Sequence, residues 1–263
     1  MKEYDYVYGR PQGGEKYKAL TEIFAARESL KSEKTSTLPL VQFWHPDGLE
    51  NRIKCHNDAL DLDLAAGQLC FEYPTSLPPG KEYGRGKASM SDLMILMPKW
   101  RVAVEAKYTE VKDENYKPLV EEWLKDNPEN RQKVLAGWKH YIGDRMTNDE
   151  KIINVTPYQL LHRIASACAD PECSPCVIYH LFWDADTRAK METFVKSLKD
   201  WVEKIELRNI RFIVATTEVL FKVSTVKLPV VELSELFLRM DEKLYGDMTN
   251  TQIVFKSDQL FIV

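Results

Sequence analysis

The chain has 263 residues, of which 44% are hydrophobic and 29% are charged, and its formal net charge is −4. This composition is typical of a globular protein with a packed core, and no apolar run approaches the roughly 20 residues that cross a bilayer. The N-terminal sequence lacks the apolar segment of a secretion signal, so we expect a cytoplasmic location and no membrane partner. The five cysteines are an odd number, which argues against a disulfide framework.

The first part of the chain is expected to hold two helices and two strands before a long loop. Residues 15–32 and 49–66 show the apolar spacing of helices, whereas 40–44 and 68–73 are candidate strands. The segment 74–91 contains three prolines and three glycines, which predicts a loop. Long loops of this kind often guide substrates or cover active sites.

Residues 92–107 are the most informative part of the sequence, because they predict two apolar strands joined by a tight turn at 98–99. Counting outward from that turn places Asp92 opposite Glu105. Side chains alternate along a strand, so Glu105 and Lys107 are expected on the same face. Two carboxylates and an ammonium group should therefore converge at the open end of a hydrophobic hairpin.

The second part of the chain is expected to continue with helices and strands that complete a mixed sheet. A strand-helix-strand crossover adds parallel strands to such a sheet, so the expected fold class is α/β. The expected helices are 119–142, interrupted at Asn127-Pro128, then one that Thr156 caps with Pro157 as its first residue, and 187–205; the expected strands are 176–183 and 210–215.

The hairpin charges are suited to binding a divalent cation and a phosphate. Magnesium prefers oxygen ligands, which Asp92, Glu105 and the Ala106 carbonyl group could supply, and Mn²⁺ could replace it. Lys107 could orient a water nucleophile or stabilise phosphate charge. Alternatively, Asp92 ends a loop and Lys107 reaches solvent. Glu105 resists that reading, since it follows three apolar residues and a buried charge without a partner is costly.

The local charge agrees with a polyanionic substrate. Residues 81–112 contain seven basic and four acidic side chains, although the whole chain is acidic. Electrostatic contact with phosphates depends on such local fields more than on total charge.

The spacing of Asp92, twelve intervening residues and Glu105-Ala106-Lys107 within a hairpin resembles the PD-(D/E)xK nuclease superfamily. The surrounding strings FEYPTS and VAVEAKYTE are similar to bacterial members of restriction-endonuclease-like families. Ser91 stands where the family name places proline. The resemblance covers roughly residues 50–215 and implies a restriction-endonuclease-like mixed sheet flanked by helices, with Mg²⁺-dependent hydrolysis of phosphodiester bonds.

The expected organisation is one nuclease-like domain over residues 1–263, with an N-terminal extension over 1–48 and a C-terminal one over 216–263. The C-terminal extension could close the sheet or form the interface of a homodimer. The expected substrate is nucleic acid, in particular DNA. The alternative is a catalytically inactive protein that binds nucleic acid, or serves in assembly, on the same scaffold.

The resemblance also implies supporting residues around the hairpin. The family usually carries another acidic or polar group upstream, for which Glu72 is the candidate, with Asn57 and Asp58 as alternatives. Some branches use a glutamine on the helix after the hairpin, and Gln159 occupies such a place. Arg163 lies four residues later on the same helix face and could hold a phosphate. Alternatively, both belong to an exposed polar face, and His162 is expected to be structural.

The cysteines offer a weaker hypothesis of a zinc or iron–sulfur module. Cys168, Cys173 and Cys176 could supply three thiolates, but a zinc site needs a fourth ligand. Candidates for that ligand are Cys55, Cys70 and His180. Because buried cysteine commonly behaves as a small hydrophobic residue, we favour the magnesium site.

Overall fold

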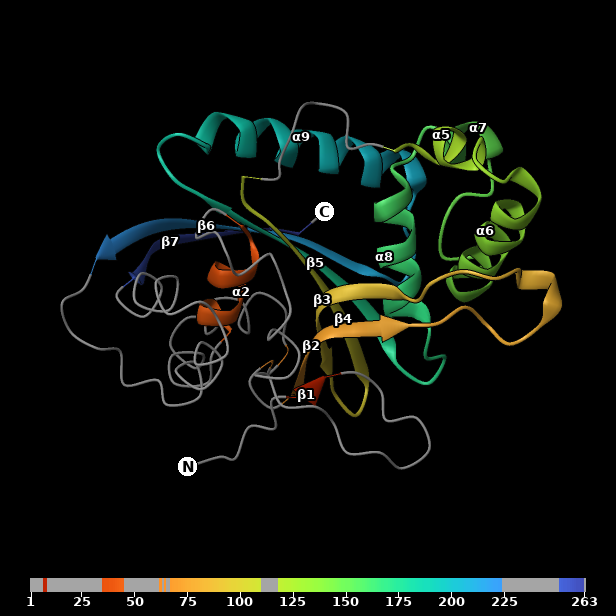
Figure 1. Cartoon of the computed structure of the whole chain (residues 1–263), viewed down its shortest axis with the longest axis horizontal. Coiled ribbons are helices and arrows are strands. Elements are labelled where there is room, and N and C mark those ends of the chain that lie inside the picture. Colours follow the sequence, from red (N-terminus) through yellow and green to blue (C-terminus); the bar gives the residue numbers. More distant parts are fainter. Residues whose placement is uncertain are drawn as a thin grey trace.

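The structure is a computed structural model that describes residues 7–8, 35–44, 62, 64, 67–109, 118–223 and 251–262. Seven strands form one sheet in the order β1-β2-β3-β4-β5-β6-β7 (Figure 1). The strands are Val7–Tyr8 (β1), Gln68–Thr75 (β2), Ser89–Leu96 (β3), Trp100–Lys107 (β4), Ser174–Trp183 (β5), Arg211–Val223 (β6) and Thr251–Ile262 (β7). The β2–β3, β3–β4 and β6–β7 pairs are antiparallel, and the other three pairs are parallel.

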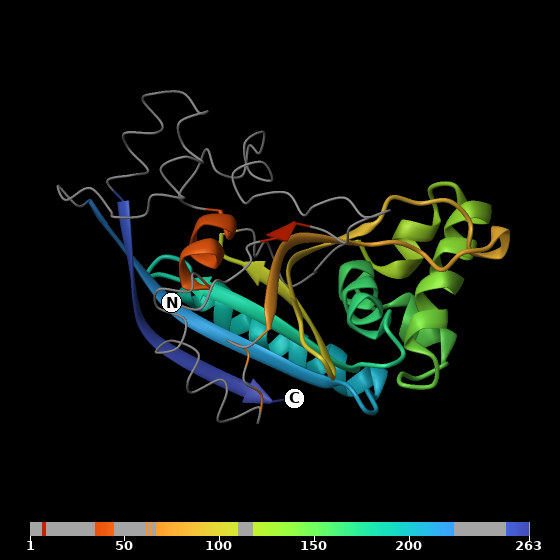
Figure 2. The ribbon, with the colours of Figure 1, turned by 90° about the horizontal axis from the view of Figure 1, so that it is seen from below.

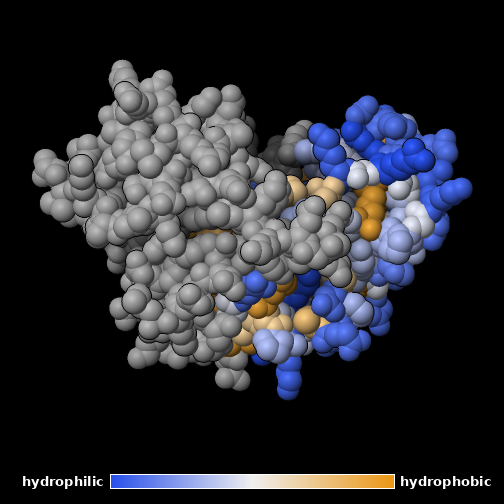
Figure 3. Space-filling model, turned by 60° about the horizontal axis from the view of Figure 1, so that its bottom comes forward, coloured by the Kyte–Doolittle hydropathy of each residue, from blue (hydrophilic) through white to orange (hydrophobic). Residues whose placement is uncertain are grey.

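Helices flank this mixed sheet, so the expected α/β class is confirmed. They are Thr37–Phe43 (α2), Val120–Leu124 (α5), Pro128–Ile142 (α6), Glu150–Asn154 (α7), Tyr158–Cys168 (α8) and Arg188–Ile205 (α9), with the 3-10 helix Lys81–Tyr83 (η3). Figure 2 shows α9 lying along β5 and β6. Helices α5 to α7 gather at one end of the molecule, where the outer surface is largely hydrophilic (Figure 3). None of the helices within the described ranges is long and apolar enough to cross a membrane.

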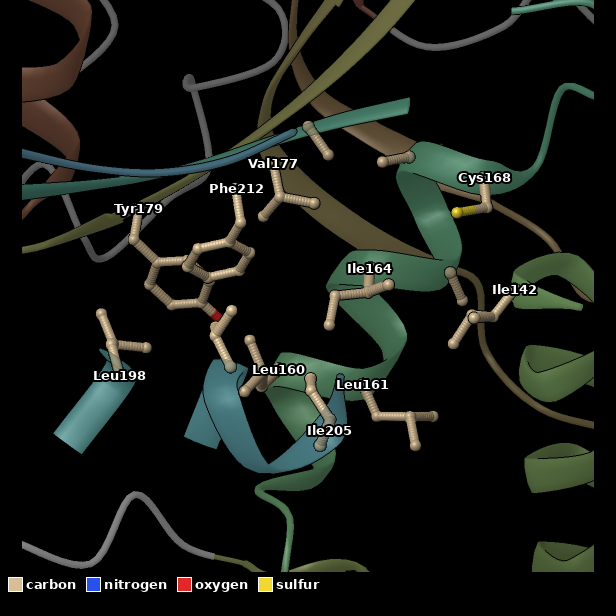
Figure 4. Close-up of a cluster of buried hydrophobic side chains, with 14 of the residues drawn as sticks. Ile142, Leu160, Leu161, Ile164, Cys168, Val177, Tyr179, Leu198, Ile205 and Phe212 are labelled. Atoms are coloured by element: carbon tan, nitrogen blue, oxygen red, sulfur yellow. The ribbon is translucent and has the colours of Figure 1, made fainter. Parts of the chain in front are cut away.

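Alternation along β5 explains how both faces of the sheet are covered. Val177, Tyr179 and Leu181 belong to a core shared with α8 and α9, which Figure 4 shows. The intervening residues His180 and Phe182 pack on the other face, where the ring of Phe43 from α2 lies 4.5 Å from that of His180. Burial on both faces accounts for the nearly continuous apolar sequence of this strand.

The register of the predicted hairpin is confirmed. Met97 N donates to Trp100 O at 3.0 Å, which closes the turn at residues 98–99. The ladder runs from Leu96 opposite Arg101 to Leu93 opposite Val104. The next pair in this count is Asp92 and Glu105, as the sequence predicted.

The predicted strand at 40–44 is wrong, because these residues form helix α2 and its C-cap. Leu40, Phe43 and Trp44 are all buried, and their spacing of three and four residues places them on one helix face. Pro39 lies in the first turn, where a missing N–H costs the helix nothing. A short apolar run next to a proline fits either structure, and packing against β5 favours the helix.

Most other elements lie close to their predicted places. The chain is interrupted at Asn127, whose φ is 59°, and Pro128 begins α6. The predicted cap of α8 is wrong by one residue: Pro157 is the N-cap, and the Thr156 hydroxyl donates to Ile152 O at 2.8 Å. The crossover from β5 through α9 to β6 is parallel, as predicted.

Both predicted extensions contribute strands to the sheet. Strand β1 pairs with β2, and β7 pairs with the long β6, so the C-terminal segment does extend the sheet. The predicted helices at 15–32 and 49–66, with Asn57, Asp58 and Cys55, lie outside the described residues apart from positions 62 and 64.

Candidate active site

Three carboxylate residues occupy one row across strands β2, β3 and β4. The pairs Phe71–Leu93 and Tyr73–Ser91 flank the level at which Glu72 meets Asp92. Continuing the β3–β4 count places Glu105 at the same level on β4. The strand register therefore brings Glu72, Asp92 and Glu105 to neighbouring positions, of which the sequence analysis had predicted the Asp92–Glu105 level.

The row coincides with irregular backbone. Glu72 has φ of 52°, a left-handed conformation that non-glycine residues seldom adopt, although only 7% of the residue is exposed. Such backbone strain tends to concentrate at functional sites. The β3–β4 ladder ends at Leu93 and Val104, and beyond it the Asp92 Oδ2 atom accepts a hydrogen bond from Ala106 N at 2.7 Å. The Asp92 side chain thus takes the place of a backbone acceptor where the two strands separate.

Glu105 is 1% exposed and receives four side-chain donors from two elements. Lys107 Nζ donates to its Oε1 at 2.7 Å, and Gln159 Nε2 donates to the same oxygen. Arg163 donates from Nε to Oε2 at 2.7 Å and also from Nη2. These donors fill the roughly four lone-pair positions of a carboxylate. Glu105 is therefore fixed in position and in charge.

Arg163 also ties β3 to this cluster. Its Nη1 donates to Ser91 Oγ, and its Nη2 donates to Met90 O at 2.7 Å. The guanidinium group thus bridges β3 and β4 in the region where their ladder has ended. Helix α8 holds it there because Leu160, Leu161 and Ile164 anchor the helix in the core (Figure 4).

The two hairpin carboxylates have opposite electrostatic character. Burial, together with the negative charge of Glu105, raises the pKa of Asp92 to about 7. Burial also acts to raise the pKa of Glu105, but the charges of Arg163 and Lys107 outweigh it and lower that pKa to about 2. When two carboxyl groups lie close together, one pKa commonly falls and the other rises. Near neutral pH, Glu105 is therefore ionised and Asp92 is able to exchange a proton.

The structure brings the predicted residues together, although their roles stay predictions. Gln159 and Arg163 share a helix face as expected, and both contact Glu105. The alternative of an exposed polar face is wrong for Arg163, whose side chain is 1% exposed and bonded to protein groups. Its predicted contact with a phosphate stays a prediction. Lys107 is 15% exposed and lies at the rim of the cluster.

Sequence reasoning missed the polar groups that support this cluster. Ser91 was noted only as a departure from the family pattern, yet it binds Arg163. His162 Nδ1 lies 2.8 Å from Ser89 Oγ, and burial together with the charge of Arg163 lowers its pKa to about 3. The imidazole is therefore neutral, in keeping with its predicted structural role. The alternate serines Ser89 and Ser91 at the start of β3 were the available signal.

The contacts of the described cysteines do not support the hypothesis of a zinc or iron–sulfur site. Burial raises the pKa of the Cys168 and Cys176 thiols to about 12, so both stay protonated near neutral pH. His180 uses both ring nitrogens in hydrogen bonds with Trp44 and Thr217. Within the part of the chain that the structure describes, no group of three or more His, Cys, Asp or Glu residues is arranged to hold a metal ion.

Fold and site together define a mixed α/β protein with a buried, charged cluster at the open end of its central hairpin. The sequence model of a family described as "Domain of unknown function (DUF6946)" matches residues 15–228, which is well over half of the chain. The chain therefore belongs to this family. Among curated proteins and among solved structures, no match to the chain was found.

Proposed function

We propose that this chain is a Mg²⁺-dependent nuclease with a PD-(D/E)xK-type site, and that DNA is its substrate. The observation that carries the proposal is the row of Glu72, Asp92 and Glu105, with Lys107 bonded to Glu105. A restriction-endonuclease-like core is part of the proposal, and the β2–β3–β4 arrangement followed by α8 and β5 supports it.

The donor set suits magnesium. Asp92, Glu105 and the Ala106 carbonyl would supply oxygen ligands, with Glu72 as a further carboxylate. Mg²⁺ usually takes only one or two protein carboxylates and completes its shell with water and substrate phosphate. A cation would also offset the burial and the Glu105 charge that together raise the pKa of Asp92. Among the described side chains no group of three or more His, Cys, Asp or Glu residues is arranged to hold a metal ion, so water and substrate phosphate would have to complete the shell.

Each residue would have a distinct part in phosphodiester hydrolysis. When bound, Mg²⁺ acts as a Lewis acid and lowers the pKa of its water. Asp92 and Glu105 would hold the cation, and Lys107 would orient the attacking water or stabilise the phosphate charge. Gln159 and Arg163 would keep the Glu105 carboxylate ionised and correctly oriented. Lys107 must exchange its contact with Glu105 for one with the substrate.

Cleavage assays test this proposal directly. We expect the parent to cut labelled DNA in Mg²⁺ or Mn²⁺, and Lys107→Met to lower the rate by at least about 10²-fold. Lys99→Met is the matched control, since Lys99 is an exposed lysine of the same hairpin, and it should cut at the parental rate. Equal rates for the two variants would refute the catalytic assignment of Lys107, and RNA in a parallel assay tests the choice of DNA.

Metal binding can be measured without a substrate. Calorimetric titration of Mn²⁺ is expected to give saturable binding to the parent that Glu105→Gln loses, while circular dichroism confirms that the variant is folded. The second candidate function is binding of nucleic acid without catalysis. The four donors on Glu105 favour it, because they occupy the oxygens that a cation needs. Tight binding with no cleavage in either metal would support that function.

A further inference from the structure

The loop that joins β2 to β3, residues 76–88, presents a group of exposed cations. Lys81, Arg85 and Lys87 are exposed, and none forms an ion pair with a carboxylate among the described residues. Glu82 is the single acidic residue of this loop. On the adjacent helix α6, Arg131 pairs with Asp126 and Lys133 with Glu129, whereas Lys139 has no ion pair with a carboxylate among the described residues. The loop thus carries three of the cations in this region that have no carboxylate partner among the described residues.

Contacts with α6 hold the loop backbone in place. Arg85 N donates to Asn130 Oδ1 at 2.9 Å, and Asn130 Nδ2 donates to Arg85 O at 2.8 Å. Gly137 lets the loop approach closely, since a Cβ atom there would lie 2.9 Å from Leu77 Cδ2 and 3.2 Å from Tyr83 Cβ. Backbone fixed in this way loses little entropy on binding, while the charged side chains stay in solvent.

Both ends of the loop lead into the carboxylate row. Strand β2 ends at Thr75, three residues after Glu72, and β3 begins at Ser89, three residues before Asp92. Three strand residues span about 10 Å, which is about three nucleotides at the roughly 3.4 Å rise of one strand. A nucleic-acid strand with one phosphate at the row would therefore reach the ends of the loop within a few nucleotides, and Lys87 lies only two residues before Ser89.

Because the whole protein is acidic, a positively charged loop beside the site would favour binding of a polyanion. The net charge of −4 and the carboxylates of the row both repel a polyanion. Binding consequently needs a local positive surface beside the site, and phosphate contacts supply most of the affinity of sequence-independent binding. The loop lies on the hydrophilic end of the molecule seen in Figure 3, next to α6.

We propose that the β2–β3 loop is a contact surface for a nucleic-acid backbone, with Lys81, Arg85 and Lys87 bound to phosphates of the strand that enters the candidate active site. This inference rests on the proposed function, because it assumes that the carboxylate row acts on nucleic acid. It assigns substrate binding to residues that take no part in the chemistry.

Fluorescence anisotropy in EDTA tests the loop without cleavage, using a labelled DNA single strand and the same strand annealed to its complement. The test variant combines Lys81→Gln, Arg85→Gln and Lys87→Gln. The matched control combines Lys190→Gln, Lys196→Gln and Lys204→Gln, three exposed lysines of α9, and changes the net charge equally. We expect the loop variant to bind at least about tenfold more weakly and to lower the salt slope of log K by about 2 to 3. The control should retain the parental values.

The outcomes separate this proposal from the nuclease proposal. Equal losses in the loop and α9 variants would show a mere effect of net charge and would overturn the loop assignment. Absence of parental binding to both DNA forms would overturn it as well. If the loop variant binds DNA more weakly and the parent does not cleave, the loop proposal stands and the nuclease proposal is refuted. If the parent cleaves DNA and the loop variant binds it as tightly as the parent does, the nuclease proposal stands and the loop proposal is refuted.

Discussion

Replacing Arg163 by methionine is expected to lower the free energy of unfolding by about 3–5 kcal/mol near neutral pH. Arg163 and Glu105 are each 1% exposed, so the substitution leaves a buried carboxylate without its main countercharge. Gln159 and Lys107 remain as donors, but only Lys107 is charged, and it lies at the rim. Urea unfolding of the parent and the variant measures the difference.

The pH dependence identifies the cause of this loss. The Arg163 charge helps to lower the pKa of Glu105 from its ordinary 4.5 to about 2, even though burial acts in the opposite direction. A lowered pKa contributes stability that is present above the unfolded value and is lost as pH falls through the folded value. The variant lacks this contribution, so its deficit should be larger at about pH 7 than at about pH 4.

Arg101→Met is the matched control for Arg163→Met. Arg101 is also buried, but it donates to neutral groups, Ser166 O at 2.8 Å and Thr75 Oγ1 at 3.3 Å. Its loss leaves no orphaned carboxylate, so its cost should be smaller and should not vary between these pH values. An Arg163 deficit that is equally independent of pH would contradict the countercharge role.

The hairpin could be predicted from sequence because its constraints are local. A two-residue turn and strict side-chain alternation leave one register, which fixes Asp92 relative to Glu105. Glu105 drew attention because a charge after three apolar residues must find partners. The spacing of Gln159 and Arg163 also fixed their common face, and this face does reach Glu105.

Long-range packing could not be predicted in the same way. Helical spacing does not say how deeply a face is buried, so the sequence offered Arg163 as a phosphate contact or as part of an exposed polar face, and neither interpretation predicted its burial. The left-handed backbone of Glu72 has no sequence signal such as glycine or asparagine. Helix α2 packs on β5 through an aromatic contact between Phe43 and His180, which are 137 residues apart and whose contact no local pattern predicts. Local sequence patterns therefore predicted which residues form the cluster, whereas their burial and backbone conformation depend on tertiary contacts that the sequence does not reveal.

Asp92→Asn is expected to slow cleavage strongly and to retain stability that the parent loses as pH rises through about 7. An asparagine side-chain oxygen can still accept the hydrogen bond from Ala106 N, so the local geometry is kept. The variant loses the negative charge that would bind the cation, which should lower the cleavage rate by at least about 10²-fold. It also loses the repulsion from Glu105.

The sign of the stability change follows from the raised pKa. Burial and the Glu105 charge raise the pKa of Asp92 from 3.8 to about 7, so the folded protein binds a proton that the unfolded chain has released. Stability from this group is full below the unfolded pKa and is lost as pH rises through the folded one. Between about pH 5 and 8 the parent should lose on the order of 2 kcal/mol that Asp92→Asn retains.

Asp184→Asn provides the control for the same measurement. Burial acts to raise the pKa of Asp184, but hydrogen bonds from Tyr108 and Thr187 lower it overall. Stability from this carboxylate is fully present from about pH 5 to 8, so its loss should cost the same at both ends of the range. If Asp92→Asn also shows a constant difference from the parent across this range, burial and the Glu105 charge do not raise the pKa of Asp92, and the prediction is wrong. A growing difference together with lost cleavage would show that the row gives up stability in order to hold a cation, as active sites commonly do.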